Sequence, residues 1–302
     1  MAAIETSGLT KRYGKARGVT ELTLRVEEGE FFGFIGPNGA GKSTTIRTLL
    51  GLIAPTAGSA SVLGHDVRGD RRALLREVGY LPSEASFYAG MRVRDVLRFS
   101  AGLRGADCAR EAARLCERLE LDTARRVDEL SFGNRKKVGI VCAMQHRPRL
   151  LILDEPTSGL DPLMQREFFA LLREQNGRGT TVFLSSHILS EIQRNCQRAA
   201  IIREGRLIAC GSVETLSGGG TRRVTVRPAV SLQGLTGVRD VQTMEDGVSF
   251  LYGGELRALI DALHGQAISD LTVAEPSLEE VFMHYYTGET RREAKRDDDF
   301  PA

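Results

Sequence analysis

The sequence has no long apolar run. Nowhere do about 18 uncharged apolar residues follow one another, and the first residues lack the apolar segment of a secretory signal. We therefore expect no membrane span and a cytoplasmic location. A strong charge of either sign is also missing, because 41 Lys and Arg residues balance 39 Asp and Glu residues to a net charge of +2. Bulk charge thus favours neither nucleic acid nor anionic lipid as a partner.

Cysteine is scarce, and no two cysteines have the C-x2-C spacing. An odd number of thiols spread through the chain is typical of reduced cysteines in a cytoplasm. We expect the five to fill the core: Cys108, Cys116, Cys142, Cys196 and Cys210.

The length of 302 residues predicts two domains, at a prior of about 150 residues per domain, and the hydrophobic fraction of 41% is ordinary for a chain with a core. A turn-rich SGGG stretch at 217–220 indicates the boundary. We expect a first domain over 1–219, a second over 220–288 and a charged, disordered tail over 289–302.

Three short apolar runs predict buried strands of an α/β fold. Residues 31–35 (FFGFI) end at a Gly-rich turn, which leads into a segment with its apolar residues on one helical face. Residues 150–154 and 181–185 flank a helical segment around 164–174, as a parallel sheet with crossover helices requires. The helical pattern between 93 and 144 predicts an inserted helical subdomain.

The residues beyond the SGGG stretch alternate between strand and helix patterns. This alternation predicts a small C-terminal α/β domain. Its expected strands are 223–227, 238–243, 248–252 and 268–273, and its expected helices are 255–264 and 278–286.

A phosphate-binding motif follows the first predicted strand. Residues 36–43 fit G-x-x-x-x-G-K-[ST] between a strand and a helix, the context that supports the motif. Its glycines let backbone N–H groups point at phosphate oxygens near a helix N-terminus. Lys42 adds a positive charge, and the Ser43 hydroxyl, or that of Thr44, can ligate Mg²⁺. The expected nucleotide-binding residues are Gly36, Pro37, Asn38, Gly39, Ala40, Gly41, Lys42, Ser43 and Thr44.

Two adjacent carboxylates end the apolar run 150–153. Ligands of open α/β sheets bind at the carboxyl ends of the strands. We expect Asp154 to hold Mg²⁺ and Glu155 to polarise the water that attacks the terminal phosphate.

The run LSFGN, residues 130–134, resembles the LSGGQ signature of the ABC (ATP-binding cassette) ATPases, and it precedes an apolar helix and Asp154 as in that family. The resemblance covers about residues 4–216. It implies a RecA-like parallel sheet, an antiparallel β subdomain and an inserted helical subdomain. It also implies a homodimer with two ATP molecules between the copies, in which Ser131 and Gly133 contact the nucleotide of the partner.

Further positions match the same family. The resemblance implies that Tyr13 stacks on adenine, and that Asp161, in the D-loop SGLD, contacts the opposite subunit. It implies that His187, after the strand TVFLS, touches the terminal phosphate and orients the attacking water.

The sequence departs from the family at Phe132 and Asn134, within the signature, and after GYLP at 79–82. There the family places a glutamine that touches Mg²⁺ and senses the membrane partner, and this chain has Ser83 and Glu84. The role of that glutamine stays unassigned. The loop and the SLEEVF motif at 277–282 resemble the type-2 group of drug- and peptide-resistance exporters.

The reading is therefore an ATPase subunit that drives export through a separate permease. A soluble ABC ATPase is the alternative, but a DNA-repair type needs a long coiled coil and a translation type needs two cassettes. A GTPase or kinase is disfavoured, because no N-K-x-D motif is present. Two roles stay open for the C-terminal domain. Either it regulates the cassette or supports its dimer, or it only packs on its own cassette.

Overall fold

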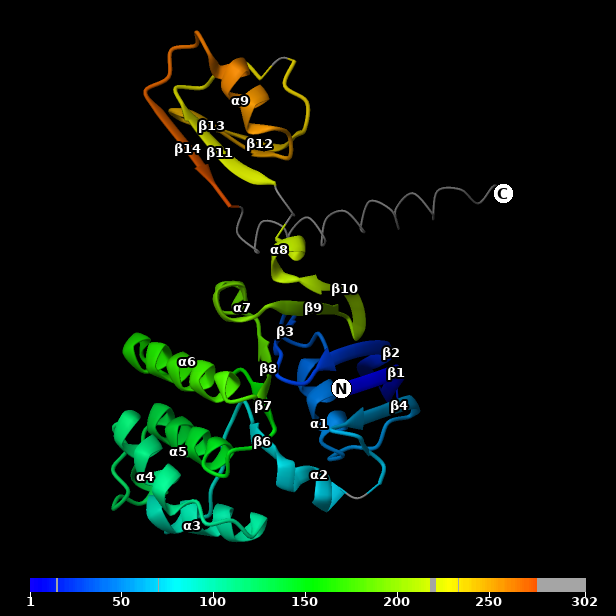
Figure 1. The fold of residues 1–302 in the computed structure, drawn as a ribbon, viewed down its shortest axis with the longest axis vertical. Coiled ribbons are helices and arrows are strands. Elements are labelled where there is room, and N and C mark those ends of the chain that lie inside the picture. The colour runs from blue at the N-terminus through cyan, green and yellow to red at the C-terminus, as the bar shows by residue number, and fades with distance from the viewer. Residues whose placement is uncertain (15, 70, 218–220, 233, 276–302) are drawn as a thin grey trace. The chain divides into compact units, whose positions relative to one another are not determined.

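The computed structural model describes residues 1–14, 16–69, 71–217, 221–232 and 234–275 (Figure 1). The chain divides into two units, 1–211 and 212–302. The helix expected at 278–286 and the tail at 289–302 lie outside the described residues. Among the residues that the structure describes, no helix has the length and apolar composition needed to cross a bilayer.

A six-stranded sheet forms the centre of the first unit, with strand order β10-β9-β3-β8-β7-β6. Neighbouring strands from β9 to β6 run parallel. Every residue of β3, β7 and β8 is buried, which explains their unbroken apolar sequences. The predicted parallel sheet is confirmed. Its strands are β3 (Phe31–Ile35), β6 (Val78–Leu81), β7 (Leu150–Asp154), β8 (Thr181–Ser186), β9 (Arg198–Arg203) and β10 (Arg206–Ser212).

Four helices belong to this part of the unit: α1 (Lys42–Leu49), α2 (Arg71–Glu77), α6 (Pro162–Gly177) and α7 (Leu189–Asn195). Ile46 and Leu49 of α1 are fully buried in a core that also contains side chains of the parallel sheet. The helix expected around 164–174 lies within α6, whose buried face includes Phe168 and Leu172.

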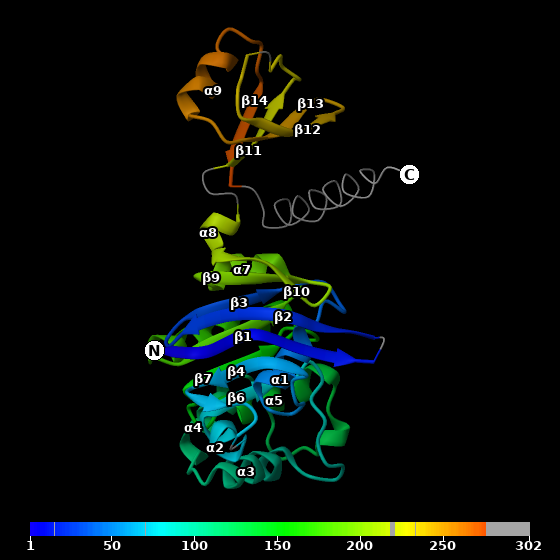
Figure 2. The same cartoon turned by 90° about the vertical axis from the view of Figure 1, so that its right-hand side faces the viewer.

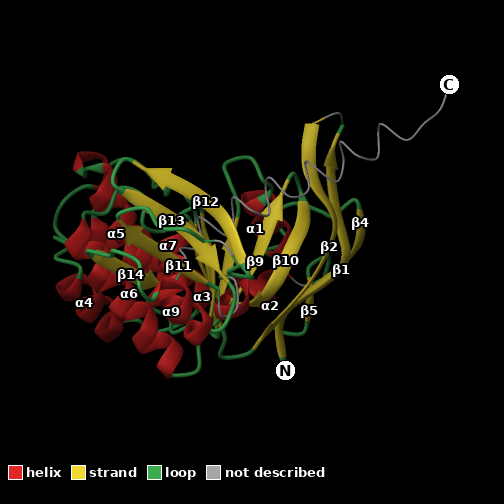
Figure 3. Cartoon of the chain, turned by 90° about the horizontal axis from the view of Figure 1, so that it is seen from above, coloured by secondary structure: helices red, strands yellow, loops and turns green. Residues whose placement is uncertain are grey.

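An antiparallel sheet, in the order β2-β1-β4-β5, packs against the same core. Its strands are β1 (Ala2–Tyr13), β2 (Ala16–Glu27), β4 (Ala57–Val62) and β5 (His65–Asp66). Figure 2 shows β1, β2 and β4 side by side, and in Figure 3 they lie on the opposite side of the unit from α4 and α5. This is the antiparallel subdomain that the resemblance implied.

The segment between β6 and β7 is helical, as predicted. It contains α3 (Val93–Arg104), α4 (Ala109–Arg118), a short 3-10 turn (Val127–Glu129) and α5 (Phe132–Met144). Arginines of α4 tie it to α6, because Arg114 lies 3.1 Å from Glu174 and Arg118 pairs with Glu167. Burial works against the charge of Glu111, but hydrogen bonds from Arg114 and Arg147 still hold its pKa below the usual value.

The second unit contains a four-stranded antiparallel sheet in the order β12-β13-β11-β14. One helix, α9, buries Leu259 and Leu263 against Val224, Val226 and Phe250. The predicted strands and the first predicted helix are all found, with ends shifted by one or two residues. The elements are α8 (Val213–Leu216), β11 (Arg222–Arg227), β12 (Val238–Met244), β13 (Gly247–Tyr252), α9 (Leu256–Leu263) and β14 (Asp270–Ala274).

All five cysteines are free thiols, as expected. Three of them are buried, but Cys142 is half-buried and Cys210 is exposed. The expectation that every cysteine fills the core is therefore wrong for Cys210, which lies on β10, a strand at the edge of its sheet.

Candidate functional site

The phosphate-binding motif forms a tight loop between β3 and α1. Gly39 and Gly41 have φ angles of 80° and 106°, a left-handed conformation that glycine adopts without strain. A Cβ atom on Gly36 would lie 2.5 Å from the Ile202 carbonyl oxygen. These glycines are therefore required by the path of the loop, and α1 begins directly after it, at Lys42.

Lys42 folds back over this loop. Its Nζ donates to the carbonyl oxygens of Gly36, at 2.6 Å, and Pro37, at 3.1 Å. The side chain is only 6% exposed, and Nζ also lies 3.1 Å from Oε1 of Glu155. The loop thus encloses an ammonium group whose partners are backbone carbonyls and one carboxylate.

The adjacent carboxylates stand at the carboxyl end of β7. Asp154 is buried and accepts a hydrogen bond from the Ser185 hydroxyl on β8, at 3.2 Å. Glu155 turns out of the strand with a φ of 49°, and its N–H donates to the Ser185 carbonyl at 3.0 Å. Burial and the nearby charge of Asp154 raise the pKa of Tyr80. Both residues are thus bonded to Ser185, Asp154 through its side chain and Glu155 through its backbone N–H.

His187 follows β8 and completes the cluster. Its Nδ1 lies 2.7 Å from Oε2 of Glu155. The residue before it, Ser186, makes two hydrogen bonds through its hydroxyl, which donates to Glu191 at 2.8 Å and accepts from the Ile188 N–H at 2.9 Å. The structure therefore brings Lys42, Glu155 and His187 together from three separate segments.

Oxygen ligands suited to Mg²⁺ are present beside this cluster. Ser43 and Thr44 are half-buried in the first turn of α1, and Asp154 supplies a carboxylate at the end of β7. Hydroxyl and carboxylate oxygens are the donors that this hard cation prefers. The residues at the site thus fit a magnesium ion together with a phosphate chain.

The signature residues Ser131 and Gly133 lie at the start of α5. Ser131 caps α5, where its hydroxyl accepts the Asn134 N–H at 3.3 Å. A Cβ atom on Gly133 would lie 2.5 Å from the Gly159 carbonyl oxygen, and one on Gly159 would lie 2.2 Å from the Phe132 ring. Phe132, the departure from the family pattern, therefore packs on the D-loop of its own chain.

Two other predicted residues occupy the ends of their elements. Asp161 caps α6 by accepting the Leu163 and Met164 N–H groups, each at 3.0 Å. Tyr13 ends β1. The residue is 42% exposed, and Lys11 Nζ lies 5.2 Å from the ring centroid. An exposed ring at this position is open to stacking by a ligand.

Sequence reasoning missed two residues that shape the site. Ser185 contacts both Asp154 and Glu155, but serine at the end of a strand carries no distinctive signal. Lys136, on α5, is only 1% exposed and donates to the Glu155 carbonyl at 3.0 Å. A lysine inside an apolar helix was a signal that could have identified it.

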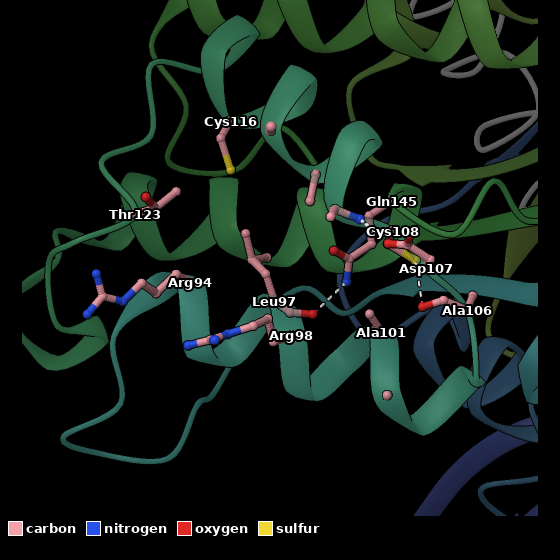
Figure 4. Close-up of a pocket in the computed structure, with 14 residues that line it drawn as sticks. Arg94, Leu97, Arg98, Ala101, Ala106, Asp107, Cys108, Cys116, Thr123 and Gln145 are labelled. Carbon is pink, nitrogen blue, oxygen red and sulfur yellow. Dashed lines mark hydrogen bonds between the residues drawn. The ribbon is translucent and has the colours of Figure 1, made fainter.

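A separate cavity of about 870 Å³ lies between α3, α4 and α5 (Figure 4). Small side chains, including Ala101 and Ala112, line much of it. Gln145, which directly follows α5, also lines it, and its Nε2 donates to the Leu97 carbonyl at 3.1 Å. Its Oε1 has no hydrogen-bond partner within the described part of the chain. Lys42, Glu155 and His187 do not line this cavity.

Comparison with known proteins places the chain in a family. The sequence model described as "ABC transporter" matches residues 19–158. The bacitracin transport ATP-binding protein of Bacillus licheniformis is 34% identical over 95% of this chain and 98% of its own length. The daunorubicin resistance ATP-binding protein DrrA3 of Streptomyces coeruleorubidus is 36% identical over 96% and 97%. Both alignments thus extend through most of the second unit.

Solved structures agree with these sequence relatives. One, an ATP-binding subunit of an ABC transporter, is 32% identical, with a TM-score of 0.68 over 71% of this chain and 91% of its own. A bacterial ABC transporter cassette, solved as a dimer, shares the fold at 24% identity, with a TM-score of 0.63 over 70% and 98%.

This chain belongs to the ABC transporter family. It is an ATP-binding subunit, and its relatives confirm the resemblance to the drug- and peptide-resistance group. The RecA-like cassette fold with its inserted helices is likewise confirmed.

Proposed function

We propose that the chain hydrolyses ATP to ADP and phosphate, and that the energy drives export through a separate membrane permease. The observation that carries the proposal is the position of Glu155. Its two carboxylate oxygens face Lys42 at 3.1 Å and His187 at 2.7 Å. A base between a phosphate-binding lysine and a histidine is the arrangement that phosphoryl transfer to water needs.

Each residue has a distinct task in this proposal. Lys42 exchanges its carbonyl partners for β- and γ-phosphate oxygens, which offer stronger charge-assisted hydrogen bonds. Glu155 accepts a proton from the attacking water, and His187 orients that water. Ser43 and Asp154 hold Mg²⁺, with Thr44 as a second hydroxyl, and the ion neutralises charge on the phosphates. Tyr13 offers its exposed ring to adenine.

The site is completed by a second copy of the chain. Ser131 and Gly133 lie at the N-terminus of α5, where backbone N–H groups and the helix dipole favour an anion. The hydroxyl of Ser131 bonds to its own helix, and the cluster around Glu155 is built from other segments. We propose that Ser131, Gly133 and the D-loop with Asp161 face the nucleotide of the partner copy in an ATP-bound homodimer.

The permease docks on the helical subdomain in this proposal. Tyr88 and Phe99 are exposed, and their rings pack edge to face with centroids 6.2 Å apart. Leu103 is 62% exposed on the same helix as Phe99. Exposed apolar groups of this kind mark interaction surfaces. The chain would then work at the cytoplasmic face of the membrane.

Export is favoured over uptake by the relatives. The daunorubicin protein is described as a resistance protein, and a further relative from Paraburkholderia xenovorans, 39% identical over 71% of this chain, is a Nod factor export ATP-binding protein. Alignment over most of the length of such subunits disfavours the alternative of a soluble ABC ATPase.

Phosphate release by the purified chain tests the proposal. We expect activity that needs both ATP and Mg²⁺ and is lost in Lys42→Ala, together with a large fall in ATP affinity by titration. Arg25→Ala, at a cation on β2 whose side chain is 54% exposed, is the control for loss of a positive charge. Absence of Mg²⁺-dependent hydrolysis by the natural chain, alone and with its permease, rules the proposal out.

A further inference from the structure

Lys136 is a buried charge with a complete set of partners. Its Nζ donates to the carbonyl oxygens of Ser83 at 2.7 Å, Pro82 at 3.1 Å and Glu155 at 3.0 Å. An ammonium group has three N–H donors, so three carbonyl acceptors satisfy all of them. The side chain is only 1% exposed. One lysine of α5 therefore joins two backbone segments that are distant in the sequence.

Burial of this charge is unfavourable, which argues against chance placement. Desolvation lowers the pKa of Lys136 to about 8, although the nearby charges of Asp154, Glu155 and Glu84 act in the opposite direction. A methionine of similar length would fill the same space without a charge to desolvate. Packing alone therefore does not account for a lysine at this position, and its three hydrogen bonds indicate a further role.

The first linked segment is the loop after β6, at 82–84. Ser83 stands there at the place of the glutamine found in the family. The helix α5 lies very close to this loop, because a Cβ atom on Gly139 would be 2.8 Å from Leu81 and 3.3 Å from Ala85. Gly139 is three residues from Lys136, so both belong to the same face of α5.

The same loop leads directly to the exposed ring of Tyr88, which packs on Phe99. A partner that pushes on this surface would displace the chain between 82 and 88. The carbonyl groups held by Lys136 are at the start of that chain, so Lys136 is placed to pass the displacement onward.

The second linked segment is the backbone of Glu155. Its N–H donates to Ser185 on one side, and its carbonyl accepts from Lys136 on the other. The residue has a φ of 49°, a conformation that the surroundings must hold in place. Release of the carbonyl would let the backbone relax and would shift the carboxylate between Lys42 and His187.

We propose that Lys136 is a positioning residue that couples the 82–84 loop to the carboxylate of Glu155, the connection for which this chain lacks the usual loop glutamine. The inference rests on the proposed hydrolysis of ATP. It assigns no proton transfer to Lys136. The ammonium holds the Glu155 backbone in its active position and transmits movement of the loop to it.

Lys136→Met tests this role, with Lys137→Met as the matched control. Lys137 is on the same helix and also buried, and among the described residues it forms no hydrogen bond or ion pair with the 82–84 loop or Glu155. We expect Lys136→Met to keep its ATP affinity within twofold and to lose at least tenfold in kcat. Amide hydrogen exchange at 83–86 should become faster in this variant alone, while Lys137→Met matches the natural chain in all three measurements.

The outcomes separate the two proposals. If the natural chain shows no Mg²⁺-dependent hydrolysis, alone and with its permease, the proposed function itself is overturned. A natural chain that is active, beside a folded Lys136→Met variant of unchanged kcat, would overturn the coupling role only. A parallel loss of ATP affinity and kcat would also overturn it, because a general structural defect predicts that result. If the methionine variant does not fold, Lys136→Gln takes its place. Its amide keeps two N–H donors on a shorter side chain, so we expect a smaller loss of kcat, again with unchanged ATP affinity.

Discussion

The imidazole of His187 lies with its Nδ1 2.7 Å from Oε2 of Glu155, while the other oxygen of that carboxylate faces Lys42. The contact joins two strands of the parallel sheet, because Glu155 follows β7 and His187 follows β8. A water that contacts both residues would be oriented by His187 and deprotonated by Glu155.

Replacement of the base should separate binding from hydrolysis. Glu155→Gln keeps the shape of the side chain but removes its ability to accept the proton from water. We expect ATP affinity to persist and kcat to fall by at least about 100-fold. Gel filtration with ATP and Mg²⁺ should then show a stable dimer, since the nucleotide stays bound. Glu28→Gln, at a carboxylate outside the site, is the control. A Glu155→Gln variant with near-natural turnover would show that another group is the base.

Loss of the histidine should affect the chemical step more than nucleotide binding. His187 is half-exposed and contacts Glu155, not the phosphate-binding loop, in this structure. We therefore expect His187→Ala to lower kcat by about 10- to 100-fold with little change in KM for ATP. His264→Ala, in the second unit, removes an exposed histidine without touching the site. A rise in KM at constant kcat would instead indicate a role in binding.

The shared site can be tested by mixing two inactive chains. If Ser131 serves the nucleotide of its partner, a dimer of one Ser131→Ala copy and one Glu155→Gln copy has one site with both residues intact. Mixed dimers should therefore regain hydrolysis that neither homodimer shows. Ser212→Ala controls for the lost helix cap, because Ser212 caps α8 through the Thr215 N–H at 3.0 Å. If Ser131 acts within its own chain, mixing restores nothing.

Much of the fold could be predicted because its signals are local. The buried strands at 31–35 and 150–154 are continuous apolar runs, and the phosphate-binding loop shows its glycines directly. The residues Lys42, Glu155 and His187 could be identified by motif, but their convergence depends on the pairing of β7 with β8.

The rest of the site depends on contacts that leave no pattern in the sequence. Lys136 bonds to backbone carbonyls, and every residue type has one, so no partner side chain points to it. The packing of Phe132 on Gly159 joins segments whose contact requires the folded helical subdomain. The residues 276–302 lie outside the described structure, so the SLEEVF motif remains a prediction.

Acid should weaken the helical subdomain through His146. Its Nε2 accepts a hydrogen bond from Arg104 at 3.1 Å, and burial, together with the Arg104 charge, lowers its pKa from 6.5 to about 4. Between these two values the unfolded chain binds more protons than the folded chain, so the free energy of unfolding falls as the pH drops from 6.5 towards 4. Above pH 6.5 this contribution is constant.

The free energy of unfolding should be about 2 kcal/mol lower at pH 5 than at pH 8 because of His146. The variant His146→Gln can still accept a hydrogen bond from Arg104 but does not titrate, so it should not show this loss. Urea unfolding of both proteins at the two pH values measures it, because carboxylates that titrate in the same range contribute equally to each and cancel in the difference. Equal pH dependence in the variant and the natural chain would mean that His146 is protonated in the folded state as easily as in the unfolded one, and that the contact with Arg104 is not maintained in solution.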